Sequence, residues 1–255
     1  MDPVLEAVIF DVDGTIADTE RHGHRVAFNL AFERLGLPYR WGEEEYGLLL
    51  EIPGGEHRLR SYLTAQGLPD EEAASLARDL HRLKQTIFLD LMRQGAAPLR
   101  AGIDRLLDEL AAGGIRVAVA TTAGRRWVGE LLGTLLGPER AARFETIVTG
   151  EDVARRKPDP QVYLIALDHL GCTAASVVAI EDSGAGVAAA TAAGLACLAV
   201  RNGYTLHQDL SLAGLVVEDI GGPGVPATVV ANPHGIAVGA AVGVDTLRSL
   251  HAATR

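Results

Sequence analysis

Two aspartates follow directly on an apolar segment near the start of the chain. We expect Ala7–Phe10 to form a buried strand, and Asp11-Val12-Asp13-Gly14-Thr15 comes immediately after it. Residues i and i+2 of a strand project to the same side, so Asp11 and Asp13 can converge on one point. One carboxylate can attack an electrophile while the other transfers a proton, which is nucleophilic catalysis with acid–base assistance. The alternative is an Asp-rich turn in which the aspartates hydrogen-bond their own backbone.

Three later positions carry polar side chains where apolar segments end. Thr121-Thr122 follow the segment 115–120, Lys157 precedes a proline and an expected helix start, and Glu181-Asp182 follow the segment 176–180. Hydroxyl and amide groups after residue 120 can hold a phosphoryl oxygen, and the two acids can hold a hard metal ion such as Mg²⁺. The alternatives are a threonine that closes a strand, a solvated basic loop and a pair of helix N-caps.

Charge balance connects these positions. If Asp11 attacks a phosphate dianion, each pair of unit charges about 4 Å apart repels by roughly 4 kcal/mol at an effective dielectric constant of 20. The acids Glu181 and Asp182 increase this repulsion unless Lys157 and a divalent cation lie among them. With both cations present, the carboxylates become ligands and the attack becomes feasible. A reaction on a phosphate group therefore explains the polar residues at all four positions.

Composition indicates a folded, acidic protein. The 255 residues are 48% hydrophobic and 22% charged, and the formal net charge of −10 disfavours a general affinity for nucleic acid or anionic membranes. The only cysteines, Cys172 and Cys197, form neither a CxxC nor a Cys/His ligand pattern. No secretory leader or transmembrane segment is evident. We expect a cytoplasmic protein that acts as a monomer and binds neither nucleic acid nor membrane.

The pattern of apolar segments predicts an α/β fold with an insert. Short apolar strands alternate with helical segments after about residue 98, and these strands are expected at 115–120, 144–148, 176–180, 195–200 and 215–217. Such strands indicate a parallel sheet covered on both faces. Residues 18–94 are more charged and mostly helical. We predict a doubly wound, Rossmann-like core formed by residues 1–17 and 95–255, with residues 18–94 as a small α-helical cap.

The ordered motifs resemble those of the haloacid dehalogenase superfamily of aspartate-nucleophile phosphatases. Over nearly the whole chain, DxDGT is followed by a strand-closing hydroxyl, a Lys-Pro pair and a Glu-Asp pair. The resemblance implies that Asp11 forms an aspartyl-phosphate and that Asp13 protonates the leaving group and then activates water. It also implies that Thr121 and Lys157, together with Thr122, grip the transferring phosphoryl group.

The same resemblance implies a magnesium site. Asp11, the carbonyl of Asp13 and Asp182 would hold Mg²⁺, with Glu181 bound directly or through water. Dehalogenase members of the superfamily lack the second aspartate, so Asp13 favours phosphatase or mutase chemistry.

Within the superfamily, the chain is similar to the CbbY-type phosphatases of xylulose-1,5-bisphosphate, an inhibitory by-product of Rubisco in the Calvin cycle. The resemblance is carried by residues such as Asp18-Thr19-Glu20, Trp41, Tyr46-Gly47, Gly54-Gly55 and Tyr204-Thr205. It implies that Glu20, Tyr46 and Arg58 face the sugar and its second phosphate. Glu56 stands where those phosphatases usually carry lysine, which leaves both a bisphosphate and a monophosphate as candidate substrates.

Other functions remain open at this point. A phosphomutase similar to β-phosphoglucomutase would share the core and the cap, and a phosphoglycolate phosphatase would differ mainly in its cap contacts. A phospho-aspartate switch or binding module is the alternative outside enzymes. Asp13 would be a general base beside Asp11, the residue that accepts the phosphoryl group. Such a base disfavours the long-lived acyl phosphate that a switch needs.

Overall fold

The computed structural model describes residues 4–52, 54–222 and 224–254. The chain divides into two compact units, the described residues of Met1–Ala17 with Leu99–Arg255, and those of Asp18–Pro98. The first unit is an α/β sheet and the second is helical. The chain therefore passes from the first unit to the second after Ala17, shortly after the DxDGT motif, and re-enters the first unit at Leu99.

A seven-stranded sheet forms the first unit, in the order β3-β2-β1-β4-β5-β6-β7. The strands β1 to β6 are parallel, and β7 pairs antiparallel with β6. The strand bounds are β1 Ala7–Phe10, β2 Arg116–Ala120, β3 Phe144–Val148, β4 Val177–Glu181, β5 Ala196–Val200, β6 Leu215–Val217 and β7 Val229–Ala231. The predicted doubly wound α/β fold is confirmed, with boundary shifts of one residue at β2, β4 and β5.

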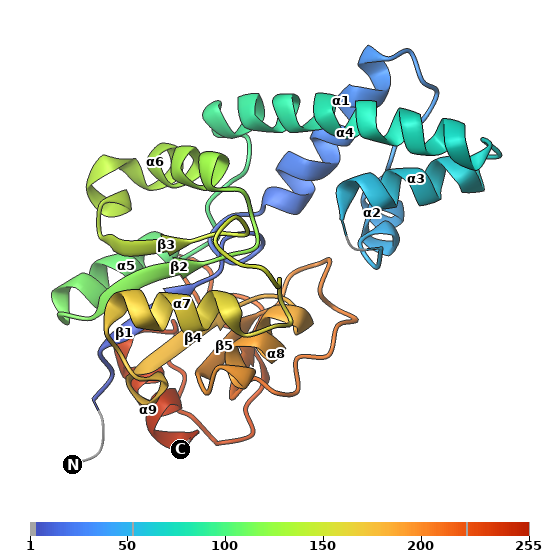
Figure 1. Cartoon of the computed structure of the whole chain (residues 1–255). Helices are drawn as coiled ribbons and strands as arrows, with labels where there is room; N and C mark the ends of the chain where they lie inside the picture. The colour runs from blue at the N-terminus through green and yellow to red at the C-terminus, as the bar shows by residue number, and fades with distance from the viewer. Residues whose placement is uncertain (1–3, 53, 223, 255) are drawn as a thin grey trace. The chain divides into compact units, whose positions relative to one another are not determined.

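Helices cover both faces of this sheet (Figure 1). On one face α7 (Gln161–Leu170) and α8 (Gly184–Ala192) bury the core around Ile9, Ala118 and Ala179. On the other, α5 (Ile103–Ala112) and α9 (Val244–Ala253) pack against each other and against the central strands. The helix α6 (Arg125–Ala141) packs against β3. Burial on both faces explains why the strands read as continuous apolar segments.

The strand order reverses between β1 and β4. From β1 the chain continues through β2 and β3 on one side, and β4, β5 and β6 then extend the sheet on the other side. In doubly wound sheets this reversal opens a crevice at the carboxyl ends of the strands. The chain places Asp11 after β1 and Asp182 after β4, the two strands that flank the reversal.

The helical unit is held by an aromatic cluster. It consists of a short π-helical turn at Glu20–His24, α1 (Arg25–Arg34), α2 (Glu43–Leu49), α3 (Gly55–Ala65) and α4 (Asp70–Arg93). Trp41 is fully buried, with its ring centroid 4.8 Å from that of Phe28 and 5.0 Å from that of Phe32. The Asn29 side chain donates to the Trp41 carbonyl (2.9 Å) and accepts from its N–H (2.8 Å). Packing within the unit thus fixes the loop between α1 and α2.

Two elements near the C-terminus were not predicted from the sequence, the edge strand β7 and the helix α9. Arg105 joins this region to α5, because its Nη2 donates to the carbonyls of Ile220 (3.3 Å), Gly221 (3.1 Å) and Val242 (2.9 Å). Across the described ranges, none of the helices combines the length and apolar character that a membrane span requires.

Candidate active site

A buried ion pair occupies the carboxyl end of β1. The Nζ atom of Lys157 lies 2.7 Å from Oδ1 of Asp11, and it also donates to the carbonyl of Ala120 (2.9 Å) at the end of β2. Its third partner is the carboxylate of Glu181 at the end of β4. The ammonium group of Lys157 therefore donates hydrogen bonds to groups at the ends of three strands. The side chain of Lys157 is only 6% exposed, so it is not a solvated loop lysine.

Hydrogen bonds to both carboxylate oxygens hold Glu181 in place within this cluster. It is fully buried, and its Oε1 accepts from Lys157 and from the hydroxyl of Tyr163 (2.7 Å). Its Oε2 accepts from the N–H of Asp182 (3.1 Å) and from the hydroxyl of Ser183 (3.3 Å). Both oxygens thus have protein partners. Sequence reasoning missed Tyr163, because nothing in the spacing of α7 singles out one tyrosine on an apolar face.

Asp182 lies at the same end of the sheet and has one partner that the sequence analysis missed. The Nδ2 atom of Asn202, in the loop after β5, donates to Asp182 Oδ2 (2.7 Å). Gly14 makes room for this contact, because a Cβ atom there would lie 2.2 Å from Asp182 Oδ2. Gly14 also has a φ of +79°, a conformation that favours glycine. The glycine of the DxDGT motif therefore lets the first turn approach the acid after β4.

Burial dominates the electrostatics of the cluster. Burial raises the pKa of Asp11 to about 8, Lys157 opposes the shift, and the charges of Glu181 and Asp13 add to it. Burial, together with the charges of Glu181 and Asp11, also holds the pKa of Asp182 well above its ordinary value. Burial alone would lower the pKa of Lys157, but Asp11 and Glu181 hold it above the ordinary value, so the lysine stays charged.

The remaining predicted core residues surround this cluster. Asp13 is half-buried, and its charge is near enough to raise the pKa of Asp11. Thr121 is buried, and its Oγ1 accepts from the N–H of Ala123 (3.2 Å). Thr122 lies against the loop after β3, where a Cβ atom on Gly150 would stand 2.3 Å from the Thr122 carbonyl oxygen. The backbone after β2 thus turns sharply beside the carbonyl that Lys157 binds.

The donor set fits a hard divalent cation. Asp11, Glu181 and Asp182 each offer a carboxylate oxygen, and these atoms lie within 4.8 Å of one another. With Asp13, whose charge acts on Asp11, the cluster has four carboxylates and one lysine, so it carries an excess of negative charge unless protons or a cation balance it. Carboxylate oxygens with room for water are the ligands that Mg²⁺ prefers.

The three predicted sugar-binding residues lie together within the helical unit. The hydroxyl of Tyr46 donates to Glu20 Oε2 (2.6 Å). The guanidinium of Arg58 stands 5.6 Å from the centroid of the Tyr46 ring, and its Nε donates to the carbonyl of Leu49 (2.8 Å). Tyr46 also packs in the aromatic cluster, so its ring is structural while its hydroxyl is directed to Glu20.

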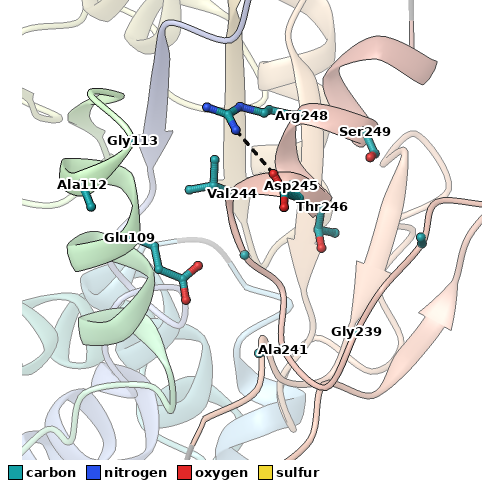
Figure 2. Close-up of a pocket in the computed structure, with 12 residues that line it drawn as sticks. Glu109, Ala112, Gly113, Gly239, Ala241, Val244, Asp245, Thr246, Arg248 and Ser249 are labelled. Carbon is teal, nitrogen blue, oxygen red and sulfur yellow. Dashed lines mark hydrogen bonds and ion pairs between the residues drawn. The ribbon is translucent and has the colours of Figure 1, made fainter.

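A pocket elsewhere in the sheet unit lacks catalytic side chains. It has a volume of about 630 Å³ and lies between α5 and the start of α9. Figure 2 shows Glu109 of α5 on one side and Asp245 of α9 on the other, with Arg248 directed to Asp245 (3.4 Å). The described residues that line it include neither a nucleophile beside a base nor a cluster of metal ligands, so we assign the site to the strand ends.

Comparison with known proteins agrees with this site. A family model described as haloacid dehalogenase-like hydrolase matches residues 8–200. Protein CbbY of Rhodobacter capsulatus is 39% identical over 216 residues, covering 85% of this chain and 94% of that protein. A CBBY-like protein of Arabidopsis thaliana is 38% identical over 223 residues, covering 85% of this chain and 70% of that protein. The crystal structure of a CbbY variant from Rhodobacter sphaeroides with xylulose-(1,5)bisphosphate has 38% identity and a TM-score of 0.72, covering 86% of this chain and 97% of that one.

Proposed function

This chain belongs to the haloacid dehalogenase-like hydrolases and is a phosphatase of the CbbY type, and from this premise we propose that it dephosphorylates a small phosphorylated sugar through an aspartyl-phosphate on Asp11. The observation that carries the proposal is the buried contact of Asp11 with Lys157 beside Glu181 and Asp182. This geometry supplies a nucleophile, a fixed cation and a metal-ligand set at one point.

Two chemical steps follow from the arrangement. A carboxylate oxygen of Asp11 attacks phosphorus, the bond to the sugar oxygen breaks, and Asp13 gives its proton to that oxygen. Asp13 then takes a proton from water, which attacks the same phosphorus and releases phosphate and free Asp11. Lys157 holds the attacking carboxylate and offsets its charge, while the turn at Thr121-Thr122 offers a hydroxyl and amides to the phosphoryl oxygens.

We propose Mg²⁺ as the cofactor. Asp11, the Asp13 carbonyl and Asp182 would hold it, and Glu181 would take part directly or through water. When bound, the ion would offset the charge of the acids and of the phosphoryl group. The full set of protein partners on Glu181 favours the indirect route.

Xylulose-1,5-bisphosphate is the substrate that the resemblance favours. We propose that a second phosphate group of the substrate would bind to the helical unit, and a cation there favours this, because Lys84 is buried with its Nζ 2.7 Å from His24 Nδ1. Burial lowers the pKa of His81; Lys84, His24 and Arg58 lower it further, and Glu56 opposes them. The charged neighbours that act on His81 thus include the cations Lys84 and Arg58 and the acid Glu56, a balance that favours an anionic ligand.

The test is phosphate release with Mg²⁺ across sugar monophosphates and bisphosphates, including xylulose-1,5-bisphosphate and phosphoglycolate. We expect turnover that Asp11→Asn reduces by about 10³-fold or more without unfolding the protein. Substantial residual turnover in that variant would exclude Asp11 as the nucleophile. Isomerised sugar phosphate without released phosphate would indicate a mutase, and a stable acyl phosphate without turnover would indicate a switch.

The variant Glu56→Lys tests which substrate class the helical unit accepts. If a second phosphate binds near that loop, the lysine should lower KM for bisphosphates and leave KM for monophosphates unchanged. Equal effects on both classes would place the second phosphate elsewhere.

A further inference from the structure

The loop after β5 holds the acid after β4 through one asparagine. Asn202 donates from Nδ2 to Asp182 Oδ2 (2.7 Å), and its Oδ1 accepts the N–H of Tyr204 (2.9 Å). Because a donor and an acceptor are both engaged, only one orientation of the amide satisfies the two contacts. Asn202 thus occupies one oxygen of Asp182 and leaves the other, Oδ1, available for a cation.

The backbone of Asn202 is fixed as well. Its N–H donates to Oγ1 of the buried Thr205 (2.9 Å), and its carbonyl accepts the N–H of Thr205 (3.1 Å). The preceding residue is held on both sides, since the N–H of Arg201 donates to the carbonyl of Val217 (2.8 Å) and its carbonyl accepts from Arg100. The asparagine is therefore presented by a rigid turn.

Arg100 connects this turn to two other chain segments. Its Nη2 donates to the carbonyls of Arg201 (3.1 Å) and Glu218 (2.8 Å), and its backbone N–H donates to the carbonyl of Ile16 (2.8 Å). Ile16 belongs to the turn between Asp13 and Ala17. One arginine thus ties the DxDGT turn, the Asn202 loop and the end of β6 together.

We propose that Asn202 is a positioning residue that orients the carboxylate of Asp182 for a divalent cation, and that Arg100 supports it by fixing the loop. The inference rests on the proposed metal site. It assigns a role to a residue in the loop after β5, a strand that contributes no metal ligand. Partners of this kind commonly change metal affinity by 10- to 100-fold when they are removed.

The test measures divalent-ion binding to the whole protein without substrate, by titration calorimetry with Mg²⁺ and with Mn²⁺. We expect Asn202→Ala to raise Kd by about 10-fold or more. Asn232→Ala is the matched control, because Asn232 also makes two side-chain contacts, both with the backbone of Ile236. We expect that control to leave Kd unchanged. An Asn202→Ala protein that folds and binds the ion within twofold of wild type would overturn the inference.

A second pair of variants keeps the inference testable if Asn202→Ala does not fold. Arg100→Met, which removes side-chain contacts to two carbonyls, should raise Kd about threefold or more. Arg105→Met, which removes side-chain contacts to three carbonyls, should not. Equal Kd values for these two variants would overturn the role of Arg100. Asp182→Asn separates the two proposals, because unchanged ion binding in that variant would reject the metal site itself.

Discussion

At the scale of single residues, two carboxylates of the site share one buried cation. Lys157 contacts Asp11 and Glu181, and the second of these acids is fully buried. A buried carboxylate is unfavourable unless hydrogen bonds and opposite charge satisfy it. The ring of partners around Glu181 therefore keeps Lys157 charged and directed at the nucleophile.

Tyr163→Phe tests this interpretation. The change removes the hydroxyl that donates to Glu181 Oε1 (2.7 Å) and keeps the ring, so the free energy of unfolding should fall by about 1–3 kcal/mol. Urea unfolding at pH 7 would measure it. Tyr39→Phe is the control, because the hydroxyl of Tyr39 has no hydrogen bond within the described part of the chain. A loss in Tyr163→Phe no larger than in the control would show that Glu181 does not need this donor.

The site residues differ in how visible they are in the sequence. Asp11, Asp13, Lys157 and the Glu181-Asp182 pair stand at the ends of apolar segments, where type and spacing already indicate chemistry. Asn202 could not be found in this way, because its partner Asp182 is 20 residues away and only the pairing of β4 with β5 brings them together. Contacts between neighbouring strand ends depend on register, which a single sequence does not display.

At the scale of elements, the predicted strands also have a pattern that is recognisable in the sequence, and the missed strand has none. The strands β1 to β5 are apolar because both faces of the sheet are covered. The strand β7 is exposed along its whole length, in a segment rich in glycine and proline, so it carries no such pattern. The helix α9 did offer a signal, since Leu247 and Leu250 lie on its buried side at helical spacing.

The start of α8 carries a glycine, Gly186, because the helix lies so close to the site. A Cβ atom on Gly186 would lie 2.0 Å from the carboxylate of Glu181, so this helix approaches β4 only because a glycine stands there. Gly186→Ala should lower the free energy of unfolding by about 2 kcal/mol or more, because the helix or the acid must move.

Gly133→Ala is the matched control, in α6 with no atom within 4 Å of its added Cβ. It should be neutral or stabilise the protein by about 0.5–1 kcal/mol. Thermal and urea unfolding of both variants would measure the difference. Equal stabilities would mean that α8 can withdraw from Glu181 without loss.

At the scale of the whole molecule, stability and metal binding are linked through the buried acids. Burial raises the pKa of Asp11 to about 8, whereas the unfolded carboxyl has its ordinary value of 3.8. At Asp11, the folded protein without metal therefore binds more proton than the unfolded chain does between about pH 4 and pH 8. The stability contributed by this group is fully present below pH 4 and is lost as pH rises toward 8.

A divalent cation should reverse this loss, because it replaces the proton as the partner of the acids. We expect the rise in Tm on adding Mg²⁺ to be larger at pH 8 than at pH 5.5, since fewer protons compete at the higher pH. Differential scanning fluorimetry in matched buffers, with and without Mg²⁺, would measure it. Asp182→Asn is the control that should abolish most of the increase at both pH values. An Mg²⁺ effect on Tm that is independent of pH would show that these carboxylates take up no proton when the protein folds without the ion.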